Sequence, residues 1–60
     1  MQLPADDFIA LSFINTKLRD EYPSLDAFCE DCEDSREDIC RRMQKIGYEY
    51  CKNSNSFIRV

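Results

Sequence analysis

The chain has 60 residues, of which 43% are hydrophobic, 12 are acidic, 8 are basic and none is histidine. This length allows one small domain over residues 1–60 with a thin core, and the hydrophobic content is too high for a disordered chain. The formal net charge of −4 disfavours non-specific binding to nucleic acids or anionic membranes, which needs a dense field of basic groups. Without histidine, catalytic triads and histidine-based metal sites are excluded.

The first predicted element is a helix over residues 7–22. Asp6 is placed to cap its start, and Pro23 blocks its continuation. Apolar side chains recur at helical spacing on one face, which we expect to pack into the core. They are Phe8, Leu11, Ile14, Leu18 and Tyr22.

A second apolar ridge on this helix consists of Ile9 and Phe13. At about 100° per residue, both side chains lie roughly opposite Leu11. Either the end of the chain folds over the ridge, with Tyr50 or Phe57 covering it, or the ridge is an exposed patch. An exposed patch would serve a protein partner or a symmetric homodimer. We hypothesise that Phe13 contributes to such an intermolecular contact.

Two shorter helices are predicted next, over residues 25–32 and 36–46. Ser24 and Ser35 are placed as their N-caps, and Gly47 as the residue that ends the second one. The apolar stripe of the first consists of Leu25, Phe28, Cys29 and Cys32. The core face of the second consists of Ile39, Met43 and Ile46.

The remaining connections have turn and strand character. Glu33 and Asp34 are expected to form the turn between the two short helices. Residues 48–60 are predicted to form a hairpin, because Tyr48 and Tyr50 flank a polar residue in an alternating pattern and a turn-like stretch precedes a β-prone end. The expected fold is therefore mainly α within the α+β class, with three helices followed by a C-terminal β-hairpin.

The four cysteines raise the question of a zinc site formed by Cys29, Cys32, Cys40 and Cys51. Cys29-x-x-Cys32 is a normal first half of an all-cysteine site, but ten residues rather than two separate Cys40 from Cys51. Cys29 and Cys32 also belong to the apolar stripe of a capped helix, and free cysteine behaves as a small buried hydrophobe. We therefore expect core cysteines and no bound metal, with a zinc-stabilised mini-domain as an alternative.

We expect no enzymatic activity and no cofactor. The sequence has no histidine, no nucleophile next to a base and no glycine-rich phosphate loop. A redox-active Cys-x-x-Cys pair needs a cationic setting that lowers the thiol pKa, whereas Glu30 and Asp31 would raise it.

The N-terminal residues predict a cytoplasmic location. Residues 1–7 are acidic where a secretory signal would be basic, and the apolar run over residues 8–13 is too short for a signal peptide. No stretch approaches the length of a transmembrane helix, so we expect a protein of the cytoplasm with reduced thiols and no membrane contact.

The stretch over residues 24–47 resembles a bacterial helix-turn-helix. Cys29 occupies the place of the small packed residue, Ser35 the cap of the second helix and Ile39 the β-branched anchor four residues later. Glu33 departs from the pattern by taking the place of the common turn glycine. A helix before this stretch and a hairpin after it make the predicted fold winged-helix-like.

Four segments carry a second resemblance: Leu3-Pro4, Asn15 to Asp20, Ser24 to Asp26 and Ile46 to Tyr50. They resemble a family of small bacterial proteins, similar in length to this chain, that is classed as a domain of unknown function. The resemblance implies a bacterial cytoplasmic protein without assigned activity, cofactor or four-cysteine pattern. It transfers no site residues.

In a helix-turn-helix, the second helix enters the major groove of DNA. Here that helix carries Arg36 and Arg41, the candidate nucleic-acid-binding residues. Acidic residues four positions before Arg41 and Arg42 can pair with both, which explains much of the basic charge without DNA. Residues 24–34 add five acidic side chains that phosphates would repel. We therefore expect a non-enzymatic protein-interaction or regulatory module, with a DNA-binding transcriptional regulator as the alternative.

Overall fold

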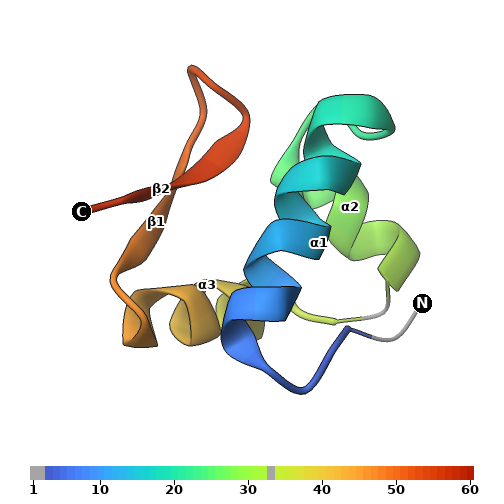
Figure 1. The fold of residues 1–60 in the computed structure, drawn as a ribbon. Helices are drawn as coiled ribbons and strands as arrows, with labels where there is room; N and C mark the ends of the chain where they lie inside the picture. The colour runs from blue at the N-terminus through green and yellow to red at the C-terminus, as the bar shows by residue number, and fades with distance from the viewer. Residues whose placement is uncertain (1–2, 33) are drawn as a thin grey trace.

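Three helices precede a two-stranded antiparallel hairpin in the computed structural model, which describes residues 3–32 and 34–60 (Figure 1). The elements are α1 (Asp7–Asp20), α2 (Leu25–Cys32), α3 (Arg36–Lys45), β1 (Tyr48–Cys51) and β2 (Ser56–Arg59). The predicted α+β fold is thereby confirmed. Glu33 of the predicted turn and residues 1–2 of the acidic N-terminal segment lie outside the described residues.

The helix ends follow the capping residues. Asp6 caps α1, and the helix ends at Asp20, two residues before the predicted boundary, with Glu21 as its C-cap. The Ser35 hydroxyl accepts a hydrogen bond from the Asp38 backbone N–H at 3.1 Å and so caps α3. Gly47 follows α3 with a φ of 85°, a left-handed conformation that glycine adopts without the steric penalty of a Cβ atom.

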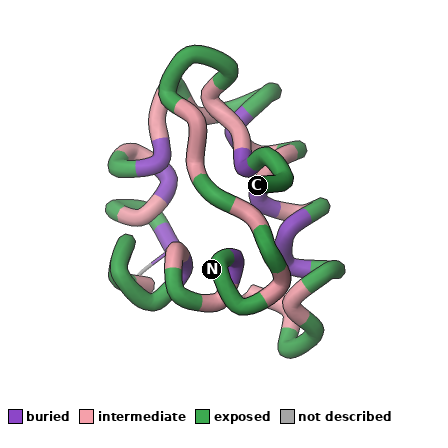
Figure 2. The backbone as a smooth tube through the Cα atoms, turned by 90° about the vertical axis from the view of Figure 1, so that its left-hand side faces the viewer, coloured by how far each residue is buried: buried purple, intermediate pink, exposed green. Residues whose placement is uncertain are grey.

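The core lies between the three helices and one side chain of the hairpin. In Figure 2 the buried stretches lie on the helices and at one point of β2, whereas the loops are half-buried or exposed. Tyr22 packs its ring edge-on against Phe28, with 5.4 Å between the ring centres. The buried side chains are those of Ala10, Leu11, Ile14, Leu18, Leu25, Phe28, Cys32, Ile39, Met43 and Phe57.

The prediction that Phe8 belongs to the core face of α1 is wrong, because its side chain is 60% exposed. The buried face of α1 centres on Ala10 and Ile14, which are fully buried. Phe8 lies about 120° around the helix from Ile14 at 100° per residue. It therefore falls beside the core rather than over it.

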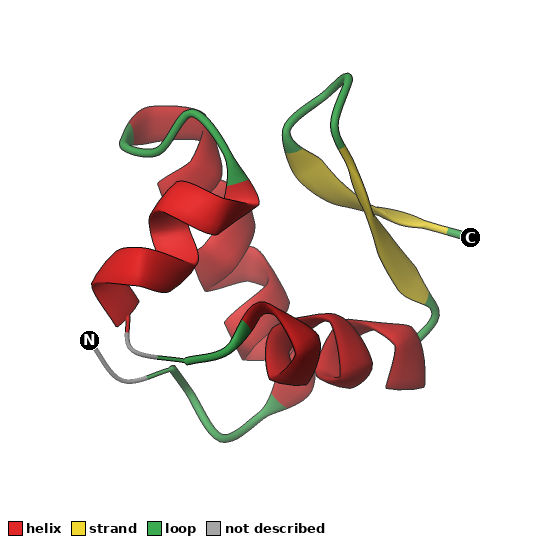
Figure 3. Cartoon of the chain, turned by 180° about the vertical axis from the view of Figure 1, so that it is seen from behind, coloured by secondary structure: helices red, strands yellow, loops and turns green. Residues whose placement is uncertain are grey.

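The hairpin follows α3 directly (Figure 3) and has the register Tyr48↔Arg59 to Cys51↔Ser56. Its turn is closed by the Asn55 backbone N–H, which donates to the carbonyl oxygen of Lys52 at 3.3 Å. Asn55 has a φ of 50°, a left-handed conformation that asparagine tolerates better than most residues.

One asparagine of α1 attaches β2 to the helix. The Asn15 side-chain oxygen accepts from the Phe57 backbone N–H at 2.7 Å, and its nitrogen donates to the Phe57 carbonyl oxygen at 3.1 Å. A side-chain amide thus pairs with the edge of β2 as the backbone of a neighbouring strand would.

A second asparagine attaches the turn to the end of α1. The Asn55 side-chain nitrogen donates to the carbonyl oxygens of Leu18 at 3.0 Å and Tyr22 at 2.9 Å. The Tyr50 hydroxyl donates to the Asn55 side-chain oxygen at 2.6 Å and accepts from the Leu25 backbone N–H at 3.2 Å. This network joins β1, the hairpin turn, α1 and α2.

Candidate interaction surface

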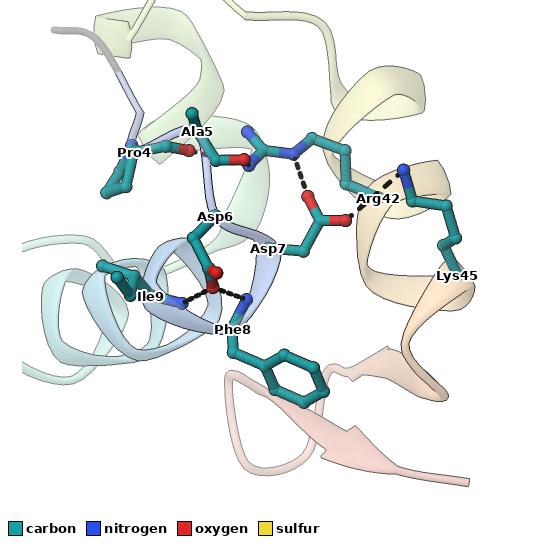
Figure 4. A network of polar contacts seen from close by, with 8 residues as sticks. All are labelled: Pro4, Ala5, Asp6, Asp7, Phe8, Ile9, Arg42 and Lys45. Carbon is teal, nitrogen blue, oxygen red and sulfur yellow. Dashed lines mark hydrogen bonds and ion pairs between the residues drawn. The ribbon is translucent and has the colours of Figure 1, made fainter.

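The first turn of α1 is capped by its own sequence (Figure 4). One carboxylate oxygen of Asp6 accepts from the backbone N–H groups of Phe8 at 2.9 Å and Ile9 at 3.0 Å. These N–H groups have no intrahelical partner at a helix start, so the cap satisfies them and fixes the backbone there.

The same turn is held against α3 by charge. The Asp7 carboxylate accepts from Arg42 Nε at 2.7 Å and lies 3.4 Å from Lys45 Nζ. Arg42 Nη2 also donates to the carbonyl oxygens of Pro4 at 2.7 Å and Ala5 at 3.2 Å (Figure 4). The hydrogen bond from Arg42 lowers the pKa of Asp7, against the rise that burial alone would cause.

Phe8 and Ile9 are presented to solvent by this fixed turn. Each side chain is 60% exposed, and successive residues of a helix point about 100° apart. Their backbone N–H groups are capped and the neighbouring residue is bound to α3, so the two apolar side chains project from ordered backbone. We call Phe8 and Ile9 the α1 surface.

Phe8 lies beside a hollow between α1 and the hairpin. The hollow has a volume of about 530 Å³ and is lined at one end by Phe8, Leu11 and Tyr48. Hydroxyl groups of α1 and of the hairpin line the rest, together with the side chains of Asn15 and Arg19. Such a mixture of apolar wall and polar groups is typical of a site that takes an apolar side chain and orients it by hydrogen bonds.

The predicted ridge of Ile9 and Phe13 is divided in the structure. Ile9 is exposed, whereas Phe13 is half-buried against the core, and Lys17 Nζ lies 5.6 Å from the centre of its ring. The hairpin docks at Asn15, which lies about 160° around the helix from Phe13. Ile9 is therefore not covered by Tyr50 or Phe57, and the ridge does not form one continuous exposed patch.

The candidate nucleic-acid-binding arginines lie on the outer side of α3, each beside a carboxylate. Arg36 Nη1 is 3.4 Å from Asp26, and Arg41 Nη1 is 3.7 Å from Asp38. The predicted pairing of Arg41 and Arg42 with residues four positions earlier is wrong. Arg42 binds Asp7 instead, because that carboxylate and two nearby carbonyl oxygens together use more of its N–H groups than Asp38 could.

The structure does not bring the four cysteines together as the zinc alternative requires. Cys32 is buried, whereas Cys29, Cys40 and Cys51 are half-buried, and all four are free thiols. Within residues 3–32 and 34–60, no three potential ligands are grouped in a way that could hold a metal ion.

The thiols differ in acidity. The pKa of Cys29 is raised to about 11, and the largest cause is burial of the thiol. The predicted rise is therefore correct in direction, but its cause is not the charge of Glu30 and Asp31. Hydrogen bonding from the backbone and side chain of Ser54 lowers the pKa of Cys51. The thiolate, and with it alkylation, is therefore favoured at Cys51 of the hairpin rather than at Cys29.

Comparison with known proteins bears on the whole chain. Among the described residues, no helix combines the length and apolar character that a bilayer span requires. Neither a curated protein nor a solved structure matches the chain. A family match extends over residues 4–57, which include the Asp6 cap, both asparagine attachments and most of the hairpin. The chain therefore belongs to the family described as a domain of unknown function (DUF4250).

Proposed function

We propose that this chain is a non-enzymatic protein-interaction module that binds a partner through the α1 surface. The observation that carries the proposal is the position of Phe8, a largely exposed aromatic ring on a doubly fixed helix turn beside a hollow. Aromatic anchors of this kind dominate the binding energy of many protein interfaces. Because the turn is already ordered, little conformational entropy is lost when a partner covers it.

The binding free energy contributed by covering Phe8 can be estimated from the exposed area of its side chain. A buried aromatic side chain covers about 150–250 Å², and the exposed part of Phe8 is 60%. At about 25 cal/mol per Å², covering that part contributes roughly 2–4 kcal/mol. This is the range of a binding hot spot, so Phe8 alone can decide whether a partner binds.

The partner supported by this geometry has an apolar side chain that enters the α1–hairpin hollow and covers Phe8. Ile9, pointing away from the hollow, widens the apolar contact. A second copy of this chain could supply such a contact in a homodimer, with Phe13 at its edge. The mass of the purified chain in solution distinguishes binding of a different protein from formation of a homodimer.

The test compares Phe8→Ser and Ile9→Ser with the control Ile58→Ser, whose side chain is 47% exposed on the outer face of β2. Proteins captured from an extract of the source organism are purified, and their affinity is then measured by calorimetry. We expect Phe8→Ser to weaken binding about 30-fold or more and Ile58→Ser to leave it unchanged. Equal affinity for Phe8→Ser and the unmodified chain would contradict the proposal.

The DNA-binding alternative rests on one observation, the 76% exposure of the Arg41 side chain on α3. Its test is a titration of a mixed-sequence duplex at low and at high salt, since groove-reading proteins bind any duplex weakly in a salt-sensitive way. Arg19→Ala is a matched control, because Arg19 is equally exposed and also lies beside an acidic residue, Asp20. Salt-sensitive binding weakened by Arg41→Ala alone would favour the regulator over the interaction module.

A further inference from the structure

The phase of the hairpin ladder defines which backbone groups face outward. The Val60 N–H donates to the Gly47 carbonyl oxygen at 2.9 Å, and the register makes Glu49 and Ile58 the next hydrogen-bonded pair. In an antiparallel ladder, hydrogen-bonded and non-hydrogen-bonded pairs alternate. The N–H and C=O groups of the intervening residues therefore point away from the partner strand.

On β2 the outward-facing backbone groups of Phe57 are hydrogen-bonded. Phe57 belongs to a non-hydrogen-bonded pair, and both of its backbone groups are bound by the Asn15 side chain. This contact confirms the phase independently, because it could not form if those groups pointed towards β1. The fold thus protects one edge of the hairpin with a side-chain amide.

On β1 the corresponding groups belong to Tyr48 and Tyr50. Within residues 3–32 and 34–60, no hydrogen-bond partner outside the hairpin is found for their backbone N–H and C=O groups. Two residues apart on one edge, these groups have the spacing that an added antiparallel strand would pair with. An edge of this kind is a template for an extended peptide.

A cleft of about 410 Å³ lies along this edge, between β1 and α3. Glu49 and Tyr50 of β1 both line it, and its lining also includes Phe57 of β2. Because successive side chains of a strand point to opposite faces, a lining by both Glu49 and Tyr50 places the cleft along the outward edge of β1. Its helical wall consists of Arg36, Cys40 and Gln44, which are spaced four residues apart on one face of α3. We call it the β1–α3 cleft.

The end of the β1–α3 cleft nearest the hairpin turn is basic. Arg36 and Lys52 line the cleft and also a second hollow of about 240 Å³ that reaches Ser24 at the start of α2. Lys52 forms no ion pair with any described residue. The pair between Arg36 and Asp26 is exposed at both ends, so it is weak and leaves guanidinium N–H groups for another carboxylate. Of the carboxylates that line these spaces, Asp26 already lies beside Arg36, and Glu49 of β1 lies three residues before Lys52. The two cations at this end therefore form a local site for a single anionic group.

We infer that the β1–α3 cleft binds an extended, acidic peptide segment of another protein by strand addition to β1. The peptide backbone pairs with Tyr48 and Tyr50, and a peptide carboxylate lies between Arg36 and Lys52. Strand addition beside a helix combines affinity from main-chain hydrogen bonds with selectivity from side-chain contacts. This site is separate from the α1 surface, so its failure leaves the proposed function untouched.

The first experiment titrates the ¹⁵N-labelled full chain with an acetylated, amidated eight-residue peptide of alternating valine and glutamate. We expect chemical-shift changes and slower hydrogen exchange at the Tyr48 and Tyr50 amides. Phe8→Ser is expected to bind the peptide as the unmodified chain does. Changes confined to Phe8 and Ile9, or none up to the peptide's solubility limit, would overturn the inference.

Two matched peptides separate strand pairing from charge. In one, alternate backbone nitrogens are methylated, which removes the N–H donors and keeps every side chain and charge. In the other, lysine replaces glutamate. We expect no measurable binding of the methylated peptide and weaker binding of the lysine peptide. Equal affinity of the methylated peptide would overturn strand addition, and equal affinity of the lysine peptide would overturn the charge contact.

Protein variants then locate the charge contact. We expect Lys52→Ala to weaken binding about two- to fivefold, the range of an exposed ion pair. Arg59→Ala, a change at an exposed cation of β2, should leave the affinity unchanged. Equal affinity of Lys52→Ala and the unmodified chain would overturn the charge contact. Broadening at Tyr48 and Tyr50 that grows with protein concentration without peptide would replace the peptide by a second copy of this chain.

Discussion

The two halves of α1 are attached to the rest of the molecule by different chemistry. Its first turn is held by charge, through the Asp7 carboxylate against Arg42 and Lys45 of α3. Its second half is held by neutral amides, through Asn15 and Asn55, which bind backbone groups between the helix and the hairpin.

The amide attachment stabilises the fold, whereas the charged attachment positions the α1 surface. The amide contacts are part-buried and satisfy backbone groups that would otherwise be left unpaired at a packed edge, which is unfavourable by about 1–3 kcal/mol for each group. The Asp7 and Arg42 side chains are 18% and 27% exposed, so water and salt reach them and weaken their attraction. The charged attachment therefore contributes less to stability than the amide contacts and responds to salt and pH, and it positions the turn that carries Phe8 and Ile9.

Replacing Asn15 is expected to have the largest effect. Asn15→Ala leaves both backbone groups of Phe57 without their partners, which should lower the free energy of unfolding by about 2–3 kcal/mol in a urea titration. Asn53→Ala is the matched control, because Asn53 is an exposed residue of the hairpin turn and should change little. A loss for Asn15→Ala no larger than for Asn53→Ala would contradict the assignment of the stable attachment to the amide end.

Local signals in the sequence predicted much of the fold. Asp6 and Ser35 cap the helices at the expected places, and Gly47 adopts the left-handed conformation expected after α3. Each of these features depends on residues within one helical turn, which a sequence pattern contains. The hairpin was predictable for a similar reason, because alternation and a turn-forming stretch lie next to each other in the chain.

The contacts that define the site join residues far apart in the chain. Asn15 binds Phe57 across 42 positions, and Asp7 binds Arg42 across 35. A local rule assigned Arg42 to a neighbour on its own helix, and tertiary packing overrode it. The helical angle of Ile9 placed it opposite the core face but left open whether the hairpin covers it. The exposure of Phe8 depended on where the buried face is centred, which only the packed structure shows.

Asn15 did carry a signal that could have been used. Asparagine is unfavourable in the middle of a helix, because its side chain competes for backbone hydrogen bonds. An asparagine held there at such a disadvantage indicates a bond outside the helix. The partner could not be named from the sequence, since any exposed strand edge can accept an amide.

Replacing Arg42 is expected to have a smaller effect that depends on salt. Arg42→Met keeps the apolar stem but removes the bonds to Asp7 and to two carbonyl oxygens, which should lower the free energy of unfolding by about 1–2 kcal/mol at low salt. The difference from the unmodified chain should shrink at 1 M salt, where charges are screened within about 3 Å. A salt-independent difference would mean that packing of the stem, rather than charge, holds the first turn.

The smallest expected effect separates the two attachments by pH. The hydrogen bond from Arg42 lowers the pKa of Asp7 in the folded chain, below about 3.9 for an unfolded aspartate. The folded state therefore favours the carboxylate. This contribution is fully present above the unfolded pKa and is lost as the pH falls through the folded pKa.

Comparison of the unmodified chain with Asp7→Asn isolates this contribution, because all other titrating groups are shared. We expect the difference in the free energy of unfolding to be constant between pH 6 and about pH 5 and to shrink as the pH falls below about 4. The difference between the unmodified chain and Asn15→Ala should not change over this window, since an amide does not titrate there. If both differences fell together in acid, the hairpin attachment would depend on the charged end, and the two halves of α1 would form one cooperative unit rather than two separate attachments.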